Sequence, residues 1–302
     1  MIAEQPSSPP NESAAAGRRA RERTVVVYGP ESAIRRPGQL FARMRADVEL
    51  ARGLGWRLFL RDLRAHYRQS LLGYLWVLIP PVVNTLLWVF LSAQGVVNVS
   101  VPDVPYPVYV LAGSVLWQLV ADAITRPLQL ATQARPMLVK LAFPLEALPI
   151  ASLLHVGFGS LVRFALLAGV LAWYGVGHMD TLPLVPLGVF GLALLGTAIG
   201  VLLLPIGMLY KDVEHALPLV MQAAYYLTPV VYAAPTRWPA SLVTDLNPVS
   251  PLLMLTRGWL LTGETASLPA ALTVLAVTLP GLFIGWLVFR LALPFVIERM
   301  SS

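Results

Sequence analysis

Residues 182–210 read LPLVPLGVFGLALLGTAIGVLLLPIGMLY, and this stretch decides the fold. It contains no Asp, Glu, Lys or Arg. A helix of about 20 consecutive apolar residues crosses the roughly 30 Å hydrocarbon core of a bilayer. The stretch exceeds that length, so it predicts a helix that spans a membrane.

The rest of the chain has a matching composition, with 57% hydrophobic and only 13% charged residues. An ordinary soluble domain carries about 25% charged residues. Pro80 and Pro81 predict a kink in the first apolar run. The runs that predict spans are Leu71–Ser92, Tyr106–Arg126, Leu148–Tyr174, Leu182–Tyr210, Ala216–Tyr232 and Ala270–Phe289. We therefore predict an all-α, polytopic membrane protein with six transmembrane helices.

The stretch from Trp238 to Gly263 has a different pattern. Its apolar pieces are too short to span a bilayer and are broken by Asp245, Pro248, Pro251 and Arg257. Apolar pieces of roughly 10–14 residues are often re-entrant or interfacial. We predict re-entrant helices here, before the last span.

More than half of the Lys and Arg residues precede the first span. Residues 1–35, rich in Ser, Pro, Ala, Glu and Arg, predict a disordered cytoplasmic tail. In residues 36–69, Leu40, Met44 and Val48 recur at helical spacing, which predicts an amphipathic helix on the inner membrane surface. Basic flanks stay on the cytoplasmic side, so six spans place both termini in the cytoplasm. The arginines lead directly into a span, which favours a membrane and not a nucleic acid as their partner.

Several kinds of chemistry are excluded by residue type. The chain has no Cys, hence no thiolate nucleophile or thiolate metal site. A phosphate-binding Walker A loop needs Gly-Lys before Ser or Thr, and the two lysines, Lys140 and Lys211, follow Val139 and Tyr210. We find no catalytic constellation and no metal-ligand cluster, and any ATP-driven work requires another chain.

Five segments carry a resemblance to a known family. They are RDLRAHYRQSLLGYLW at 61–76, KLAFPLE at 140–146, YKDV at 210–213, LTPVVY at 227–232 and LNP at 246–248. Their order and spacing resemble the transmembrane subunits of ABC-2 type exporters of O-antigen, capsular polysaccharide or teichoic acid. The resemblance covers residues 55–296.

The resemblance implies a permease subunit that exports a lipid-linked polysaccharide across the cell inner membrane, with residues 70–297 as its ABC-2 type transmembrane domain. It also implies a homodimer bound to two ABC ATPase subunits. ATP and Mg²⁺ would bind to the ATPase, and this chain is expected to need no cofactor of its own.

The resemblance places ATPase docking on a short coupling helix in the inner stretch from Arg135 to Glu146. The residues expected to act there are Arg135, Pro136, Lys140, Phe143, Pro144 and Glu146, with a smaller second contact at Lys211, Asp212 and Glu214. The alternatives are an ordinary positively charged cytoplasmic loop for the first group and a solvated turn for the second.

Aromatic rings and one charge are the candidates for the substrate path. Sugars stack on Trp and Tyr, and the candidate rings are those of Trp88, Tyr109, Trp117, Tyr225 and Tyr226. An interfacial aromatic belt is the alternative. Arg163 lies near mid-span, where a charge costs about 2.5–3.5 kcal/mol, so it should face a polar path, pair with a neighbour or snorkel. It departs from the family pattern, in which an acidic residue often stands nearby.

Arg61, Arg64 and Arg68 complete the candidate sites, either as membrane-surface anchors or as ligands of a lipid phosphate head group. Three rival functions remain open. One is an ABC-2 permease for a drug or small lipid, the second is a membrane-bound glycosyl or acyl transferase, and the third is a secondary transporter. The last would need internal repeats, of which we see none, and intramembrane carboxylates, which the predicted spans almost lack.

Overall fold

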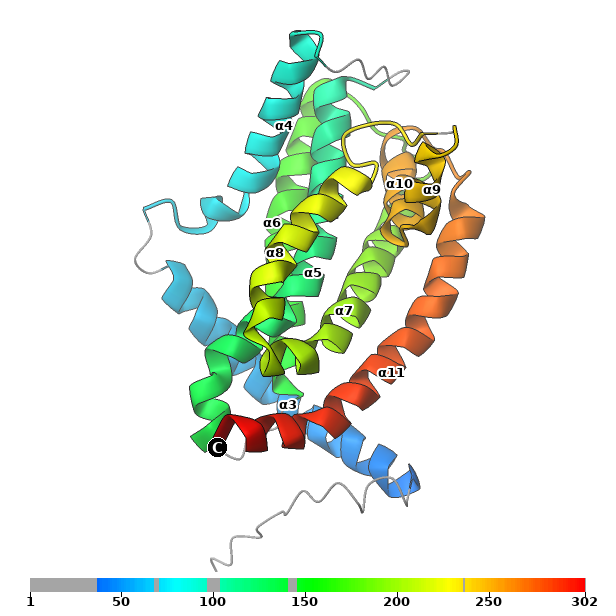
Figure 1. Ribbon diagram of the computed structural model, residues 1–302. Coiled ribbons are helices and arrows are strands. Elements are labelled where there is room, and N and C mark those ends of the chain that lie inside the picture. The colour runs from blue at the N-terminus through cyan, green and yellow to red at the C-terminus, as the bar shows by residue number, and fades with distance from the viewer. Residues whose placement is uncertain (1–36, 68–70, 97–103, 141–145, 236, 302) are drawn as a thin grey trace, which may run out of the picture.

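The computed structural model describes residues 37–67, 71–96, 104–140, 146–235 and 237–301, and every regular element in them is a helix (Figure 1). The elements are α3 (Pro37–Tyr67), the 3₁₀ helix η1 (Gly73–Val77), α4 (Ile79–Ala93), α5 (Tyr106–Lys140), α6 (Ala147–Tyr174), the 3₁₀ helix η2 (Leu182–Leu184), α7 (Val185–Leu209), α8 (Lys211–Leu227), α9 (Ala240–Leu246), α10 (Val249–Leu261) and α11 (Leu268–Ser301). The prediction of an all-α chain is confirmed.

Four helices in the described residues are long and apolar enough to cross a membrane. They cover Tyr106–Arg135, Ala147–Tyr174, Leu182–Leu209 and Leu268–Ala292. These helices fit a polytopic membrane protein and coincide with four of the six predicted spans. The helices at the other two places are shorter, with 15 residues in α4 and 17 in α8.

The centre of the bundle is the close contact between α5 and α7. A Cβ atom at Gly196 would lie 2.6 Å from the Cβ of Ala123, and one at Gly200 would lie 2.7 Å from the Ala123 carbonyl oxygen. Glycines four residues apart let two membrane helices approach backbone to backbone. Within their apolar windows, 83% of α5 is buried but only 17% of α11. The outer face of α11 is therefore left for lipid or a second subunit.

The first predicted span differs from the structure. Residues Leu71–Ser92 do not form one kinked helix, because the chain passes through η1 and only then starts α4 at Ile79. Pro80 and Pro81 occupy the first turn of α4. Proline is tolerated there, since the N–H groups of the first turn have no partner within the helix. The predicted kink is thus a helix start.

Two further boundaries shift for physical reasons. α8 ends at Leu227 and not at Tyr232, because Thr228 is extended (φ −94°, ψ 140°), and the residue before a proline disfavours the helical region. α5 continues to Lys140, well beyond the predicted inner end of the second span. Pro136 therefore lies inside α5 and does not begin a separate coupling helix.

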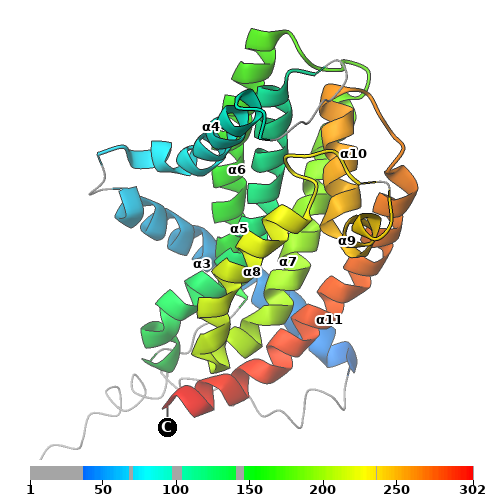
Figure 2. The same cartoon turned by 45° about the horizontal axis from the view of Figure 1, so that its top comes forward.

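The two ends of the bundle are built differently. α3 crosses beneath the bundle near the C-terminal part of α11 (Figure 1). It packs on α6, where a Cβ at Gly55 would meet the side chain of Ile150 and the ring of Phe59 lies edge-on to His155. At the other end, α10 packs against α7 and α11, with the short α9 beside it (Figure 2). The short helices α9 and α10 occupy the stretch that was predicted to be re-entrant.

Candidate functional site

A buried ion pair joins α5 and α6. The Arg163 Nη1 atom lies 2.7 Å from Oδ2 of Asp122, and the two side chains are only 6% and 14% exposed. Gln118 donates from Nε2 to the other carboxylate oxygen of Asp122 at 3.0 Å, and Arg163 Nε donates to the Val77 carbonyl at 3.2 Å. A buried charge costs several kcal/mol unless it is paired and hydrogen-bonded, and here both conditions hold.

The contacts of Arg163 show how its buried charge is accommodated. Of the surroundings expected for it, the structure shows pairing with a neighbouring helix, and its partner is Asp122. This pairing accounts for the buried charge without a substrate, and a place on the substrate path stays a prediction. The sequence feature that could have predicted this pairing is Asp122, because it is an acidic residue near the inner end of the preceding span.

A second buried arginine, Arg257 on α10, was not a candidate in the sequence. Its Nη1 donates to the carbonyls of Pro229 and Val230 at 2.9 and 2.8 Å. Its guanidinium carbon lies 3.9 Å from the centre of the Tyr109 ring, which is a cation–π contact. In the described part of the chain no carboxylate forms an ion pair with it. Sequence reasoning had treated Arg257 only as a break in the apolar pattern.

Tyr109, a predicted path residue, thus belongs to this arginine site. Its hydroxyl donates to the Tyr232 carbonyl at 3.2 Å, and Tyr106 donates to Val231 at the same distance. Asn247 donates from Nδ2 to Thr228 Oγ1 at 2.7 Å. The segment after α8 is therefore held from α5, from α10 and from the turn between α9 and α10.

The structure brings the other predicted aromatic residues together at the outer half of α8. The rings of Trp117 and Tyr225 meet edge to face at 6.0 Å, and those of Tyr225 and Tyr226 at 5.3 Å. Trp88 of α4 packs against the same core as Tyr225. Trp117 and Tyr225 are buried, whereas Tyr226 is 53% exposed. Only Tyr226 among these three presents its ring at the surface of the single chain.

Two of the predicted coupling residues make contacts within the chain. Arg135 Nη2 donates to the carbonyls of Gly207 and Met208 at 3.4 and 3.1 Å, at the end of α7. The last carbonyls of a helix lack partners within the helix and carry partial negative charge, which suits an arginine. Glu146 forms an ion pair with Arg290 of α11 at 3.3 Å.

The remaining coupling candidates are less defined. Pro136 and Lys140 lie on the last turns of α5, and Phe143 and Pro144 lie outside the described residues. Lys211, Asp212 and Glu214 form the first turn of α8. Two acidic side chains in a first turn favour the helix dipole, which is a structural role in itself.

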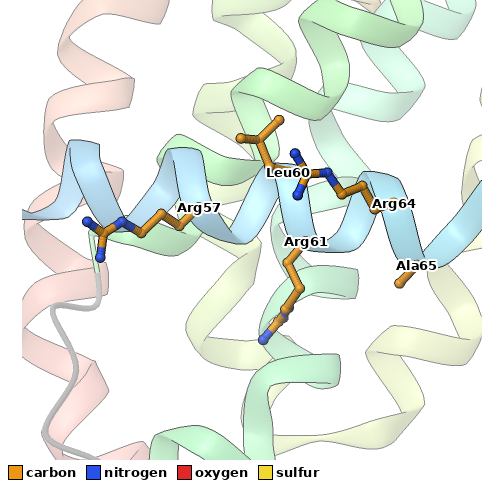
Figure 3. A pocket seen from close by; sticks show the side chains of 5 residues that line it. All are labelled: Arg57, Leu60, Arg61, Arg64 and Ala65. Carbon is orange, nitrogen blue, oxygen red and sulfur yellow. The ribbon is translucent and has the colours of Figure 1, made fainter.

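The arginines of α3 line an open cavity of about 450 Å³ together with Leu60 and Ala65 (Figure 3). Arg57, Arg61 and Arg64 lie on successive turns and are exposed. Arg61 also contacts Asp62 at 2.8 Å. Arg68 lies outside the described residues. Arg57 is an addition to the predicted set, since its spacing to Arg61 and Arg64 puts it on the same helix face.

The amino-acid sequence is similar to those of known transport proteins. No known family profile matches the chain. The chain is 23% identical over 207 residues to the O-antigen export system permease protein RfbA of Klebsiella pneumoniae, covering 67% of this chain and 78% of the relative. It is 25% identical over 221 residues to RfbA of Myxococcus xanthus, covering 70% and 81%. It is 22% identical over 254 residues to the polysialic acid transport protein KpsM of Escherichia coli, covering 82% and 96%.

The chain is thus similar along most of its length to two O-antigen export permeases and a polysialic acid transport protein. This confirms the resemblance inferred from the five sequence segments. Because the relatives are transport proteins, it also confirms the prediction of a transport subunit over that of a membrane-bound transferase. The four long apolar helices of the described residues fit a membrane protein of this kind.

Proposed function

We propose that the chain is the membrane-spanning subunit of an ATP-driven exporter that moves a lipid-linked polysaccharide across the cell inner membrane. The observation that carries the proposal is the similarity to three polysaccharide-export permeases along most of the chain. ATP and Mg²⁺ bind to a separate ATPase subunit in this proposal. Two copies of the chain and two ATPase subunits form the exporter.

The proposed topology has six crossings, made by α4, α5, α6, α7, α8 and α11. The direction of the chain reverses at each of these helices in turn, and the start of the described chain in α3 lies at the same end as the C-terminus (Figure 1). This arrangement supports a cytoplasmic location for both termini, as the basic N-terminal region also does. α9 and α10 form a re-entrant pair at the outer end.

The proposed substrate route passes between two copies of the chain, along α4 and α8. α4 carries a row of exposed apolar side chains, with Val83, Leu86 and Phe90 each more than half exposed. Tyr226 lies exposed on the neighbouring α8. Aromatic rings that stack weakly on sugar at several points would let a polymer slide, and Trp88, Trp117 and Tyr225 support the position of Tyr226 from behind.

The proposed ATPase docking site is the inner end of α5 together with the residues up to Glu146. Arg135 connects this region to the end of α7, immediately before α8 begins at Lys211. A displacement imposed at the docking site would therefore reach α8, and with it the aromatic cluster. Lys211, Asp212 and Glu214 lie where they would add the second, smaller contact.

The arginines on the exposed face of α3 are proposed to hold phosphate oxygens at the inner membrane surface. Each basic residue near anionic lipid contributes about 1 kcal/mol. Flotation with vesicles that contain anionic lipid tests this role. The isolated peptide 37–67 with Arg57→Gln and Arg64→Gln should bind such vesicles more weakly than the unchanged peptide. On vesicles of neutral lipid, both peptides should bind equally poorly.

The experiment that tests the function is co-purification with the product of any neighbouring ABC ATPase gene, followed by a measurement of polymer export in cells. Phe143→Ala should reduce ATPase binding and export, because an apolar side chain at the docking site is removed. Glu146→Ala is tested separately, since Glu146 also pairs with Arg290. Trp173→Ala, exposed at the outer end of α6, is the matched control and should change neither.

A chain that never binds an ATPase, and whose deletion leaves surface polysaccharide unchanged, contradicts the proposal. If the ATPase binds but polysaccharide is unaffected, the exporter assembly stands and the cargo is wrong.

A further inference from the structure

The start of α4 is attached to the bundle by an unusual contact. The backbone before α4 turns through η1, and its last residue, Val77, receives a hydrogen bond from Nε of Arg163. Arg163 belongs to α6, 86 positions further along the chain. The contact therefore ties the entry of the first crossing helix to the body of the bundle.

Arg163 makes this contact and the ion pair with Asp122 at the same time. The guanidinium has five N–H donors in a rigid fork, so Nη1 can bind the carboxylate while Nε binds the carbonyl. Gln118 holds the carboxylate from its other side. The orientation of the guanidinium is therefore set from α5, and the direction of its Nε–H follows from that orientation.

We propose that Arg163 is a positioning residue whose Asp122-oriented guanidinium fixes the start of α4 against α6. The ion pair supplies orientation, and the Nε hydrogen bond supplies the attachment. The upper part of α4 is held separately, where Trp88 packs against the core near Tyr225. α4 also packs against α5, and Arg163 controls the attachment at its start.

The placement of α4 is independent of what the protein transports. The consequence for transport does rest on the proposed function, because α4 borders the proposed route. The disulfide experiment measures the placement of α4 directly, so its outcome does not depend on whether polysaccharide is the cargo.

A purely stabilising ion pair is the competing explanation, and Arg163→Lys separates the two. Lysine has one compact ammonium group at the end of its chain and no donor at the position of Nε. It can keep the pairing with Asp122, but it cannot also hold the Val77 carbonyl in the same geometry. A stabilising pair survives this substitution, whereas the attachment of α4 does not.

The chain contains no cysteine, so introduced pairs can be cross-linked without background. A Cβ atom at Gly159 would lie 3.8 Å from a side-chain methyl of Val77 and 3.7 Å from Nη1 of Arg163. A disulfide between Val77→Cys and Gly159→Cys is therefore within reach, and Arg163→Lys keeps a cation beside the cysteine at position 159 in both proteins. The control pair is Leu202→Cys with Gly285→Cys, which links α7 to α11. There a Cβ at Gly285 would lie 3.6 Å from the Cβ of Leu202.

Disulfide formation is measured in the full-length protein, in membranes, with Arg163 and with Lys at position 163. We expect Arg163→Lys to slow the Val77–Gly159 disulfide by about tenfold, the effect of losing one hydrogen bond to a charged group. The control disulfide should form at an unchanged rate. Equal rates for the Val77–Gly159 pair overturn the proposal. So does slowing of both pairs together, because that outcome shows a general loss of packing.

Discussion

Two buried arginines link helices of this bundle, and they are accommodated in different ways. Arg163 and Arg257 are each 5% exposed. Arg163, between α5 and α6, is neutralised by the carboxylate of Asp122. Arg257, at the outer end, lies against backbone carbonyls and the face of the Tyr109 ring. One site depends on a single opposite charge, and the other depends on the shape of the surrounding backbone.

The backbone dependence at the second site has a specific origin in Gly113. A Cβ atom at this position would overlap the carbonyl group of Val230 and would lie 3.2 Å from Nη1 of Arg257. Only glycine lets the segment after α8 approach α5 closely enough for its carbonyls to face Arg257. Loss of a charge should therefore damage the first site, and a single added methyl group should damage the second.

The largest effect is expected for Asp122→Ala. The substitution leaves Arg163 buried without its carboxylate, and breaking a buried pair in this way costs about 3–5 kcal/mol. The free energy of unfolding in detergent micelles measures this loss. Asp180→Ala is the control, because its side chain is 92% exposed and its removal should change the free energy of unfolding very little. Equal losses in the two variants would remove the distinction between the arginine sites.

Adding Arg163→Met to Asp122→Ala should restore most of that loss. Replacing both members of a buried ion pair by apolar groups is often neutral or stabilising. We expect the double variant to unfold within about 1–2 kcal/mol of the wild type. No comparable rescue is expected for Arg257, since in the described residues no carboxylate forms an ion pair with it and Glu264 acts on its charge only from a distance. A double variant as unstable as Asp122→Ala alone would mean that Asp122 acts through contacts other than the ion pair.

At the second site, Gly113→Ala should cost about 1–3 kcal/mol, because overpacking forces the backbone apart. The shift should also weaken the bonds from Arg257, and hydrogen exchange at residues 228–232 should rise. Gly157→Ala is the matched control, since nothing lies within 4 Å of its added Cβ. That control should be neutral or slightly stabilising, because alanine is the better helix former. Unchanged exchange after Gly113→Ala would show that the approach is not tight.

The sequence predicted the long helices well, and its failures have identifiable causes. The uncharged run of α7 and the three other long spans follow from hydropathy alone. The start of α4 and the end of α8 depend on the local effect of prolines. Pro80 and Pro81 were interpreted as a kink, and the effect of Pro229 on the end of α8 was not considered. The coupling role of Glu146 stays a prediction, but its ion pair with Arg290 could not be foreseen, because Arg290 lies on a helix that begins more than a hundred residues later.

The two arginines show the same limit for the candidate site. Arg163 was identified because a charge in the middle of an apolar run needs a partner, but that partner lies 41 positions away on another helix. Arg257 was missed because the stretch around it is short and broken by prolines, so its burial is not visible in a hydropathy pattern. Only the packing of α10 against α5 and α7 creates its surroundings.

The smallest effect is expected for Tyr109→Phe, and it separates two contributions to the Arg257 site. The substitution removes the hydroxyl that donates to the Tyr232 carbonyl, and a neutral hydrogen bond contributes about 0.5–1.5 kcal/mol. It keeps the ring against the guanidinium. Tyr109→Leu removes the ring as well, and the lost cation–π contact should add about 0.5–2 kcal/mol to the destabilisation, measured by the same unfolding experiment. If the two variants are equally destabilised, the ring contributes no cation–π energy, and the charge of Arg257 is accommodated without it.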